Sequence, residues 1–322
     1  MKNNFITLLI IFILTTLFLL IFLYSKEVMD SINFSISIWK DNLLPSLFPF
    51  FLIADLLIAY GFIDLISYFF GKIMVTLFNL PKEASFVLFS SLFSGFPSGS
   101  KYTKDLLENK LINEKEANHL IMFTHFSNPL FIISTIGVLL LNNKKIGILI
   151  LFCHIISNII IGILFKNKEK KDYKKEEFKI VISKINNKRK NNKSFIFILT
   201  SSITKSFTIL IQMLGIIMFF LMITTILKKI IKLDNLTYSF LSGIIEMTQG
   251  IKNISNISTL NLKLKSSIIG LLLSFSGISV HFQVKSIIEG TTIKYKNFFI
   301  ARIVHAILCF TLIYILFNFF IN

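Results

Sequence analysis

The sequence predicts an all-α protein that crosses a membrane repeatedly, with about 8–10 membrane segments. Of its 322 residues, 54% are hydrophobic, which exceeds the roughly 45–50% typical of a soluble globular domain. Apolar runs of about 20 residues have the length of a helix that spans the hydrocarbon core. The longest such runs cover residues 5–24, 120–141, 195–227 and 298–321. We therefore expect a polytopic integral membrane protein.

Polar, helix-breaking residues interrupt this apolar sequence twice in the first half. The first interruption is the octet from Ser94 to Lys101, which reads Ser-Gly-Phe-Pro-Ser-Gly-Ser-Lys, and the second is Ser127-Asn128-Pro129. Each break frees backbone groups that lipid cannot hydrogen-bond, so it is tolerated only where protein or a water-filled cavity surrounds it. Broken helices of this kind form the substrate sites of many transporters. We expect broken or re-entrant helices, and the leading candidate site, in this stretch.

Similar features recur in the second half of the chain. A short apolar segment ends near Ser242-Gly243, and a later apolar run is interrupted at Ser276-Gly277. Ser242 follows Ser94 by 148 residues, and Ser276 follows Asn128 by the same 148 residues. Two interruptions at one common offset predict an internal duplication, although the two halves share little sequence identity.

The predicted organisation has four parts. They are an N-terminal membrane helix (1–24), a first repeat (25–165), a basic linker (166–193) and a second repeat (194–322). We expect the first helix to be retained, because Ser25-Lys26-Glu27 follows it where a signal peptide would have a small-residue cleavage site. Residues 25–41 have apolar side chains at near-helical spacing, which predicts a helix at the membrane interface with Trp39 as a headgroup anchor.

Positive charge is concentrated in the linker. The net charge of the chain is +17, and residues 166–193 contain twelve Lys or Arg residues against four acidic ones. Such a segment is expected to stay on the cytoplasmic side. A chain rich in Lys, Asn, Ile and Phe together has a general compositional bias, so we expect a solvated linker near lipid and no nucleic-acid partner.

The octet is the first candidate binding site. Gly95 allows unusual backbone angles, and Pro97 ends the incoming helix. Free N–H groups at the start of the next helix attract carboxylate or phosphate, and a lysine in that turn opposes the helix dipole unless an anion is present. This predicted anion site comprises Ser98, Gly99, Ser100 and Lys101. The alternative is a plain turn at the membrane surface with Lys101 in water.

Further candidate site residues lie near the other breaks. Glu246 is a carboxylate inside apolar sequence, where a charge is expensive and usually functional, although it could instead cap a helix at the interface. His281 is a possible titrating group, with a hydrogen-bonded packing role as the alternative. Asn128, Gln249 and Gln283 are expected to orient a substrate. The residues predicted to break helices are Gly95, Pro97, Pro129, Gly243 and Gly277.

Enzymatic activity is not expected. The sequence contains no GxSxG, HExxH or Walker A motif and no pair of neighbouring cysteines. Cys153 and Cys309 both lie in apolar runs, where a thiol acts as a small hydrophobic side chain. We therefore expect no cofactor, no metal and no disulfide.

Five motifs together resemble the YlbJ (SpoVV) family of sporulation integral membrane proteins. They are Leu44-Pro45-Ser46-Leu47-Phe48-Pro49-Phe50, the octet Ser94 to Lys101, Asn128-Pro129-Leu130-Phe131-Ile132, Gly243 to Gly250, and Ser276 to Gln283. The resemblance covers nearly the whole chain in order. It implies two gate-like repeats with nucleoside-recognition (gate) domains related to those of concentrative nucleoside transporters. It also implies transport of dipicolinic acid from the mother cell across the outer forespore membrane during sporulation.

The sequence thus predicts a membrane transporter of a small anionic solute, with dipicolinate as first candidate. Glu246 and His281 are the candidates for coupling to a proton or cation, and an oligomer is compatible with the sequence. One alternative is a nucleoside transporter of the same fold, in which Glu246 would bind ribose hydroxyls. Another is a membrane scaffold that does not transport and recruits spore-assembly partners through residues 166–193.

Overall fold

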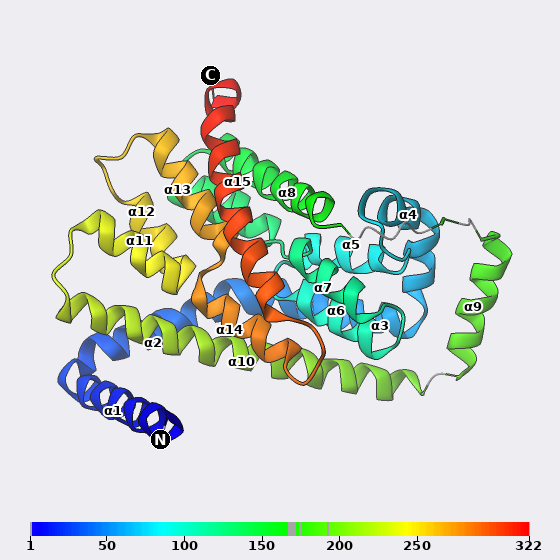
Figure 1. Cartoon of the computed structure of the whole chain (residues 1–322), viewed down its shortest axis with the longest axis horizontal. Coiled ribbons are helices and arrows are strands. Elements are labelled where there is room, and N and C mark those ends of the chain that lie inside the picture. Colours follow the sequence, from blue (N-terminus) through cyan, green and yellow to red (C-terminus); the bar gives the residue numbers. More distant parts are fainter. Residues whose placement is uncertain (1, 167–171, 174–175, 192, 322) are drawn as a thin grey trace.

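The computed structural model describes residues 2–166, 172–173, 176–191 and 193–321, and this part of the chain is all helical with no strand (Figure 1). The first half contains α1 (Lys2–Leu23), α2 (Ser25–Ile38), π-helical η1 (Trp39–Leu43), α3 (Leu44–Ala59), α4 (Phe62–Phe78), α5 (Ala84–Ser94), α6 (Ser98–Glu108), α7 (Glu114–Phe123), π-helical η2 (Phe131–Leu140) and α8 (Lys144–Leu164). The second half contains α9 (Phe178–Asn191), α10 (Phe195–Ile230), α11 (Asn235–Ile245), α12 (Met247–Ser255), α13 (Leu262–Phe275), α14 (Gly277–Ile288) and α15 (Tyr295–Ile321). The predicted all-α fold is confirmed.

Within the described residues, five helical stretches are long and apolar enough to cross a membrane, or six if α3 and α4 form one bent span. The five are Phe5–Leu23, Lys144–Leu164, Phe195–Ile230, Leu262–Ile288 and Tyr295–Ile321. α3 and α4 meet at an angle of 94°, at Gly61, whose φ of +86° is readily adopted only by glycine. α5 and η2 are apolar but shorter. Full-length spans are therefore fewer than the 8–10 segments expected, because several apolar segments are broken or half-length.

The order of elements recurs along the chain. α5, α6, α7, η2 and α8 are followed in the second half by α11, α12, α13, α14 and α15. Asn113 caps α7 by accepting a hydrogen bond from the Glu116 N–H, in a capping box, and Asn261 caps α13 by accepting one from the Leu264 N–H. Because Asn261 follows Asn113 by 148 residues, these caps have the same offset as the helix breaks.

The two halves share their hydrophobic cores. One core joins Phe78 and Phe123, whose rings stack 4.5 Å apart, to Val280 and Phe298 from the second half. A second core joins residues of η2 and α8 to residues of α12, α13 and α15. α15 packs against both α8 and α13, and crosses the centre of the molecule in Figure 1. The division into two repeats with the boundaries given above therefore stays a prediction, because each half packs into the other.

Three local details bear on the sequence-based expectations. The Trp39 Nε1–H donates a 2.8 Å hydrogen bond to the Leu210 carbonyl of α10, and its role as a headgroup anchor stays a prediction. Pro97 occupies the N-cap position of α6 without a side-chain hydrogen bond. The α11 helix continues through Gly243 to Ile245, so its break lies at Glu246.

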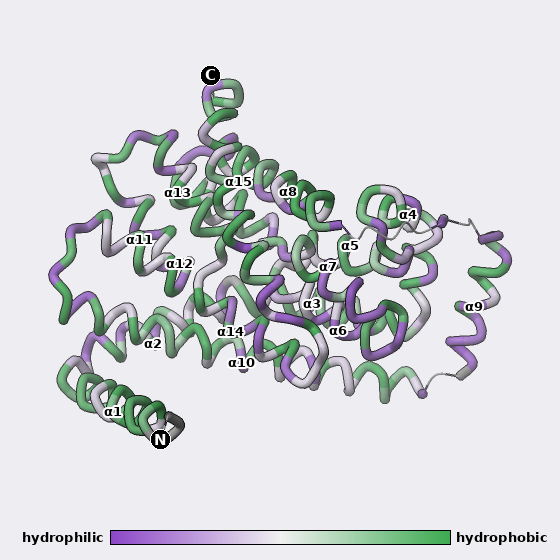
Figure 2. Tube along the Cα trace, in the orientation of Figure 1, coloured by the Kyte–Doolittle hydropathy of each residue, from purple (hydrophilic) through white to green (hydrophobic). Residues whose placement is uncertain are grey.

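The described part of the linker is a helix docked on the first half. Lys188 on α9 forms a 2.5 Å ion pair with Asp64 on α4, and Glu176 accepts hydrogen bonds from Lys82 and Lys184. Hydrogen bonds from these two lysines, with the larger effect from Lys82, hold the pKa of the Glu176 carboxyl below its ordinary value. The docking contact therefore weakens only as pH falls through that lowered pKa. Residues 167–171, 174, 175 and 192 of the predicted linker lie outside the described residues. Figure 2 shows α1 hydrophobic along its length, whereas α9 is largely hydrophilic.

Two glycines differ sharply in the space around them. A Cβ atom on Gly99 in α6 would lie 1.9 Å from the Thr124 carbonyl oxygen, whereas a Cβ on Gly215 in α10 would have no atom within 4 Å. The first helix break of the protein thus packs against the second with no room for a methyl group.

Replacing Gly99 by alanine should lower the free energy of unfolding by about 1–3 kcal/mol, because the added methyl overpacks a backbone contact. The control is Gly215→Ala, which should leave stability unchanged or raise it slightly, since alanine favours the helix. Thermal unfolding of the purified protein in detergent measures both. Equal midpoints for the two variants would contradict the close contact between α6 and residue 124.

Candidate functional site

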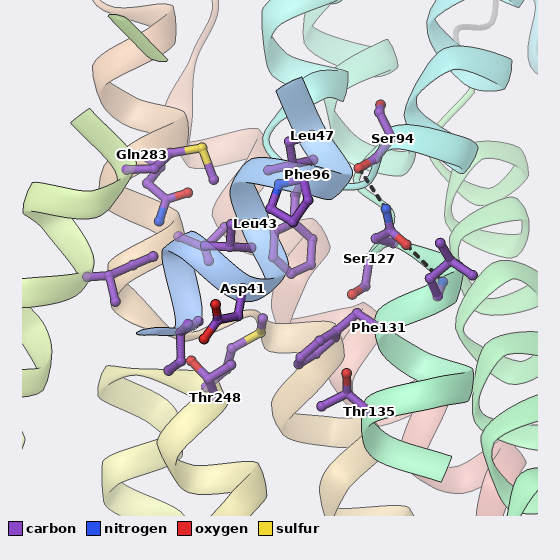
Figure 3. A pocket seen from close by; sticks show the side chains of 18 of the residues that line it. Asp41, Leu43, Leu47, Ser94, Phe96, Ser127, Phe131, Thr135, Thr248 and Gln283 are labelled. Carbon is purple, nitrogen blue, oxygen red and sulfur yellow. Dashed lines mark hydrogen bonds between the residues drawn. The ribbon is translucent and has the colours of Figure 1, made fainter. Parts of the chain in front are cut away.

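A cavity of about 340 Å³ lies between the helix breaks of the two halves (Figure 3). Polar side chains on its wall include Asp41, Ser94, Ser127, Asn128, Ser134, Thr135, Glu246, Thr248 and Gln283. Its apolar wall includes Phe96, Phe131, Leu43, Leu47, Met213 and Val280. The wall therefore comes from the α2–η1–α3 segment, the breaks of the first half, α10, and the breaks of the second half. A mixed wall of this kind is typical of a small-molecule site.

The two breaks of the first half interlock on one side of the cavity. Gly95 ends α5 with φ +83°, and a Cβ atom there would lie 2.7 Å from the Asn128 nitrogen. The Asn128 side chain accepts a 2.8 Å hydrogen bond from the Leu130 N–H and donates one of 3.4 Å to the Ser94 carbonyl. Asn128 thus satisfies freed backbone groups of both breaks, which lipid could not do.

The breaks of the second half meet in a similar way. Glu246 is only 2% exposed and caps α12, accepting hydrogen bonds from the Gln249 N–H at 2.9 Å and from the Thr248 hydroxyl at 2.6 Å. Gly277 begins α14 with φ +69°, and a Cβ there would lie 2.9 Å from the Met247 nitrogen. A carboxylate at a helix N-terminus is stabilised by the helix dipole. Glu246 therefore has the capping role that the sequence left open and also faces the cavity.

A histidine joins the two halves beside the cavity. His125 Nε2 lies 3.1 Å from the Ser276 hydroxyl of the α13–α14 break. The Phe96 ring, which lines the cavity, stacks on the His125 ring at 4.9 Å with an interplanar angle of 13°. The broken helices of the first and second halves therefore come together, as the repeated spacing suggested.

Gln283 provides a hydrogen-bonding group without a protein partner. Its side chain points into the cavity (Figure 3) and the residue is 4% exposed. Its Oε1 atom has no hydrogen-bond partner among the described residues. A buried acceptor without a partner is costly, and on a side chain that lines a cavity it can be satisfied by a solute or water once the amide turns toward the open space. Gln283 is the clearest indication that the cavity binds a polar ligand.

Comparisons with known proteins identify the family of this chain. The family described as Gate, nucleoside recognition, matches residues 42–144. The sporulation integral membrane protein YlbJ of Bacillus subtilis (strain 168) is 30% identical over 303 residues, which cover 84% of this chain and 73% of that protein. The chain belongs to the YlbJ family of sporulation integral membrane proteins. No solved structure showed significant similarity.

In this YlbJ-family protein, the predicted binding residues divide into two groups. Asn128, Glu246 and Gln283 line the cavity. Ser98 and Ser100 do not, because their hydroxyls bond to nearby chain, Ser98 to Ser94 and Ser100 to the Pro97 carbonyl. Gly99 packs against Thr124 and is also absent from the wall. The predicted anion site at the start of α6 is thus closed by the protein itself.

The remaining predicted residues also lie outside this cavity. Lys101 forms a buried ion pair with Asp55 on α3. Gln249 accepts a 2.8 Å hydrogen bond from Thr224, on the wall of a second cavity of about 420 Å³. His281 bonds to the Tyr295 hydroxyl at 2.9 Å and to the Phe275 carbonyl, which is the packing role given as its alternative. Among the helix-break residues, Gly95, Pro97, Pro129 and Gly277 lie at or beside breaks, whereas Gly243 lies inside α11.

The cavity is acidic, which differs from the expected anion site. Its charged wall residues among those described are Asp41 and Glu246, with no Lys, Arg or His beside them. Asp41 is exposed, whereas Glu246 is buried. Within the described part of the chain no group of three or more His, Cys, Asp or Glu side chains could hold a metal ion. A doubly negative solute would be repelled here unless a proton or cation accompanied it.

Sequence reasoning missed Arg302, which organises the break after α7. It is 0% exposed and donates to the Met122 carbonyl, to Asn158 Oδ1 at 3.0 Å and to His305 Nδ1 at 2.7 Å. The same guanidinium lies 3.4 Å from the His125 carbonyl. These bonds hold residues 124–128 out of helical geometry, so the helix stops at Phe123, well before the proline that predicted the break. A lone arginine in an apolar span was the signal that could have found it.

Arg302→Met should destabilise the protein by at least about 3 kcal/mol, because each buried acceptor left unpaired costs about 1–3 kcal/mol. The matched control is Arg189→Met, at the exposed arginine of α9, which should change stability by less than about 0.5 kcal/mol. Thermal unfolding in detergent compares the two. A small effect of Arg302→Met would mean that the break does not depend on this side chain.

Proposed function

We propose that the chain is a membrane transporter that binds one small planar solute in the cavity between the helix breaks. Dipicolinic acid is the first candidate solute, carried across the outer forespore membrane during sporulation. The observation that carries the proposal is the unpartnered Gln283 acceptor in a cavity bounded by broken helices of both halves. Broken helices around a polar cavity are the usual site of a secondary transporter.

The shape of the cavity supports a compact aromatic solute. A volume of about 340 Å³ is at the lower end of the roughly 300–1,000 Å³ of small-molecule sites. The Phe96 and Phe131 rings lie on its wall (Figure 3) and offer apolar faces to a planar ring. Asn128, Gln283 and the nearby hydroxyls can bond its polar edge. The name of the Bacillus subtilis relative associates that protein with sporulation, which supports the choice of solute.

The two carboxylates set a condition on this solute. Dipicolinate has two negative charges near neutral pH, and Asp41 and Glu246 would oppose it. We therefore propose that it binds with a proton or a cation. This differs from the sequence-based hypothesis, in which Lys101 neutralised the carboxylates directly.

A nucleoside is the second candidate solute, and a specific observation favours it. Carboxylates and amides are good hydrogen-bond partners for sugar hydroxyls. A neutral solute needs no basic group, and none lines the described part of the wall. The matched family description, nucleoside recognition, points the same way. Under this alternative Glu246 would accept hydrogen bonds from the ribose.

Uptake of labelled dipicolinate into proteoliposomes tests the proposal. Gln283→Leu should reduce uptake roughly tenfold or more, because it removes a hydrogen bond worth about 1.5 kcal/mol inside the cavity. The matched control is Gln212→Leu at an exposed glutamine on α10, which should keep uptake within about twofold of wild type.

Competition then distinguishes the two solutes. Excess unlabelled dipicolinate should block uptake under the first proposal, with uridine having no effect. Uptake of labelled uridine that dipicolinate does not inhibit would favour the nucleoside. Equal uptake by the wild type and Gln283→Leu would refute this use of the cavity for either solute.

A further inference from the structure

A buried ion pair lies near the cavity but outside it. Lys101 on α6 contacts Asp55 on α3, with side-chain exposures of 8% and 11%. The Lys101 ammonium also lies 4.5 Å from the Tyr102 ring centre and 5.8 Å from that of Phe51. Asp55 interrupts the otherwise apolar stretch from Phe50 to Ala59. The pair is thus enclosed by aromatic and aliphatic side chains.

The pair is incompletely satisfied, which argues against a purely stabilising role. The second carboxylate oxygen of Asp55 and the Tyr102 hydroxyl are both buried without a hydrogen-bond partner among the described residues. A buried ion pair often stabilises a fold no better than apolar side chains of the same size, and unpartnered polar atoms make it worse. Ionisable groups at membrane depth usually mark an ion or proton pathway.

Lys101 has a second carboxylate within reach. Asp105, one turn further along α6, lies 3.6 Å from the Lys101 ammonium, and its side chain is 33% exposed. The other ionisable groups near the pair are Tyr102 and Glu108 on α6 and Lys205 on α10. The charges of Glu108 and Lys205 both act on Asp105. α5, which packs against both α3 and α6, has no ionisable side chain. Lys101 can therefore exchange Asp55 for Asp105 without leaving its helix.

One helix of the pair lines the cavity, and the other begins directly after a break that lines it. α3 lines it through Leu47, two turns before Asp55, and α6 follows the break whose Ser94 and Phe96 line it. Contact between Asp55 and Lys101 therefore joins a helix of one cavity wall to the helix that follows the break in another. Separation of the two side chains would remove this direct link and leave α3 and α6 joined through α5, which packs against both.

We propose that the Asp55–Lys101 pair is a proton-exchange site that couples movement of the solute to a pH gradient. The Asp55 carboxylate gains one proton and becomes a neutral acid, while Lys101 stays an ammonium and pairs with Asp105. Loss of that proton restores the contact with Lys101. A metal cation is disfavoured because the Lys101 ammonium already occupies the place next to the carboxylate. This inference rests on the proposed transport function.

The test compares two modes of transport by the full-length chain in proteoliposomes. One is exchange of labelled for unlabelled dipicolinate at equal pH, and the other is accumulation driven by an imposed pH gradient. Asp55→Asn should keep exchange within about threefold of wild type but lose gradient-driven accumulation, because asparagine cannot take up the proton. The matched control is Asp64→Asn, which breaks the partly exposed pair with Lys188 on α9 and should retain both modes.

A second variant controls for misfolding of Asp55→Asn. Asp55→Asn leaves Lys101 buried with one partner fewer, so Asp55→Asn combined with Lys101→Gln removes both charges and should show the same loss of accumulation. The proton site would be overturned if either variant accumulated dipicolinate normally in a pH gradient. It would also be overturned if the exchange rate of the wild type did not change with pH. Absence of both modes in the wild type, with uridine as well as dipicolinate, would instead overturn the proposed function, and the inference with it.

Discussion

The structure depends on one constraint: a helix broken inside a bilayer must have its freed backbone groups bonded by the protein itself. The chain meets it largely with side chains from elsewhere in the sequence. Arg302 on α15 bonds the carbonyls at the end of α7, and His154 on α8 accepts from the Ser127 N–H at 3.0 Å. His154 also bonds Ser274 beside the second-half break. The breaks therefore come together because they share their hydrogen-bonding partners.

The same constraint explains where the cavity lies and what lines it. Most polar groups near the breaks are used internally, as Ser98, Ser100 and His281 show. The groups left for a solute are those that face the gap between the halves, above all the Gln283 oxygen and the hydroxyls around it. Positive charge is placed behind the Phe96–His125 stack, at Arg302, where carbonyls bind it. Negative charge faces the cavity, at Asp41 and Glu246, whereas the positive charge of Arg302 is separated from it by side-chain packing.

The sequence predicted the features that follow from local chemistry. Long apolar runs predicted the membrane fold, and the proline and glycine motifs predicted the approximate positions of the breaks. It could not predict which way a polar side chain turns once the halves pack. Lys101 was expected to face a solute, but Asp55, 46 residues earlier, draws it away. Asp55 and Arg302 are single charges in apolar sequence, so their importance could have been predicted. Asp41 lies among polar residues, so the sequence did not single it out.

The central claim is that the gap between the paired breaks is a water-accessible site that a solute occupies. Thiol labelling tests it in a chain with Cys153 and Cys309 replaced by alanine and a single cysteine at Thr135 on the cavity wall. A small water-soluble reagent should modify Thr135→Cys, and saturating transported solute should slow that reaction several-fold, with no such slowing at the exposed Ser183→Cys of α9. Thr135→Cys that is inert, or that reacts equally fast with and without solute, would contradict the account.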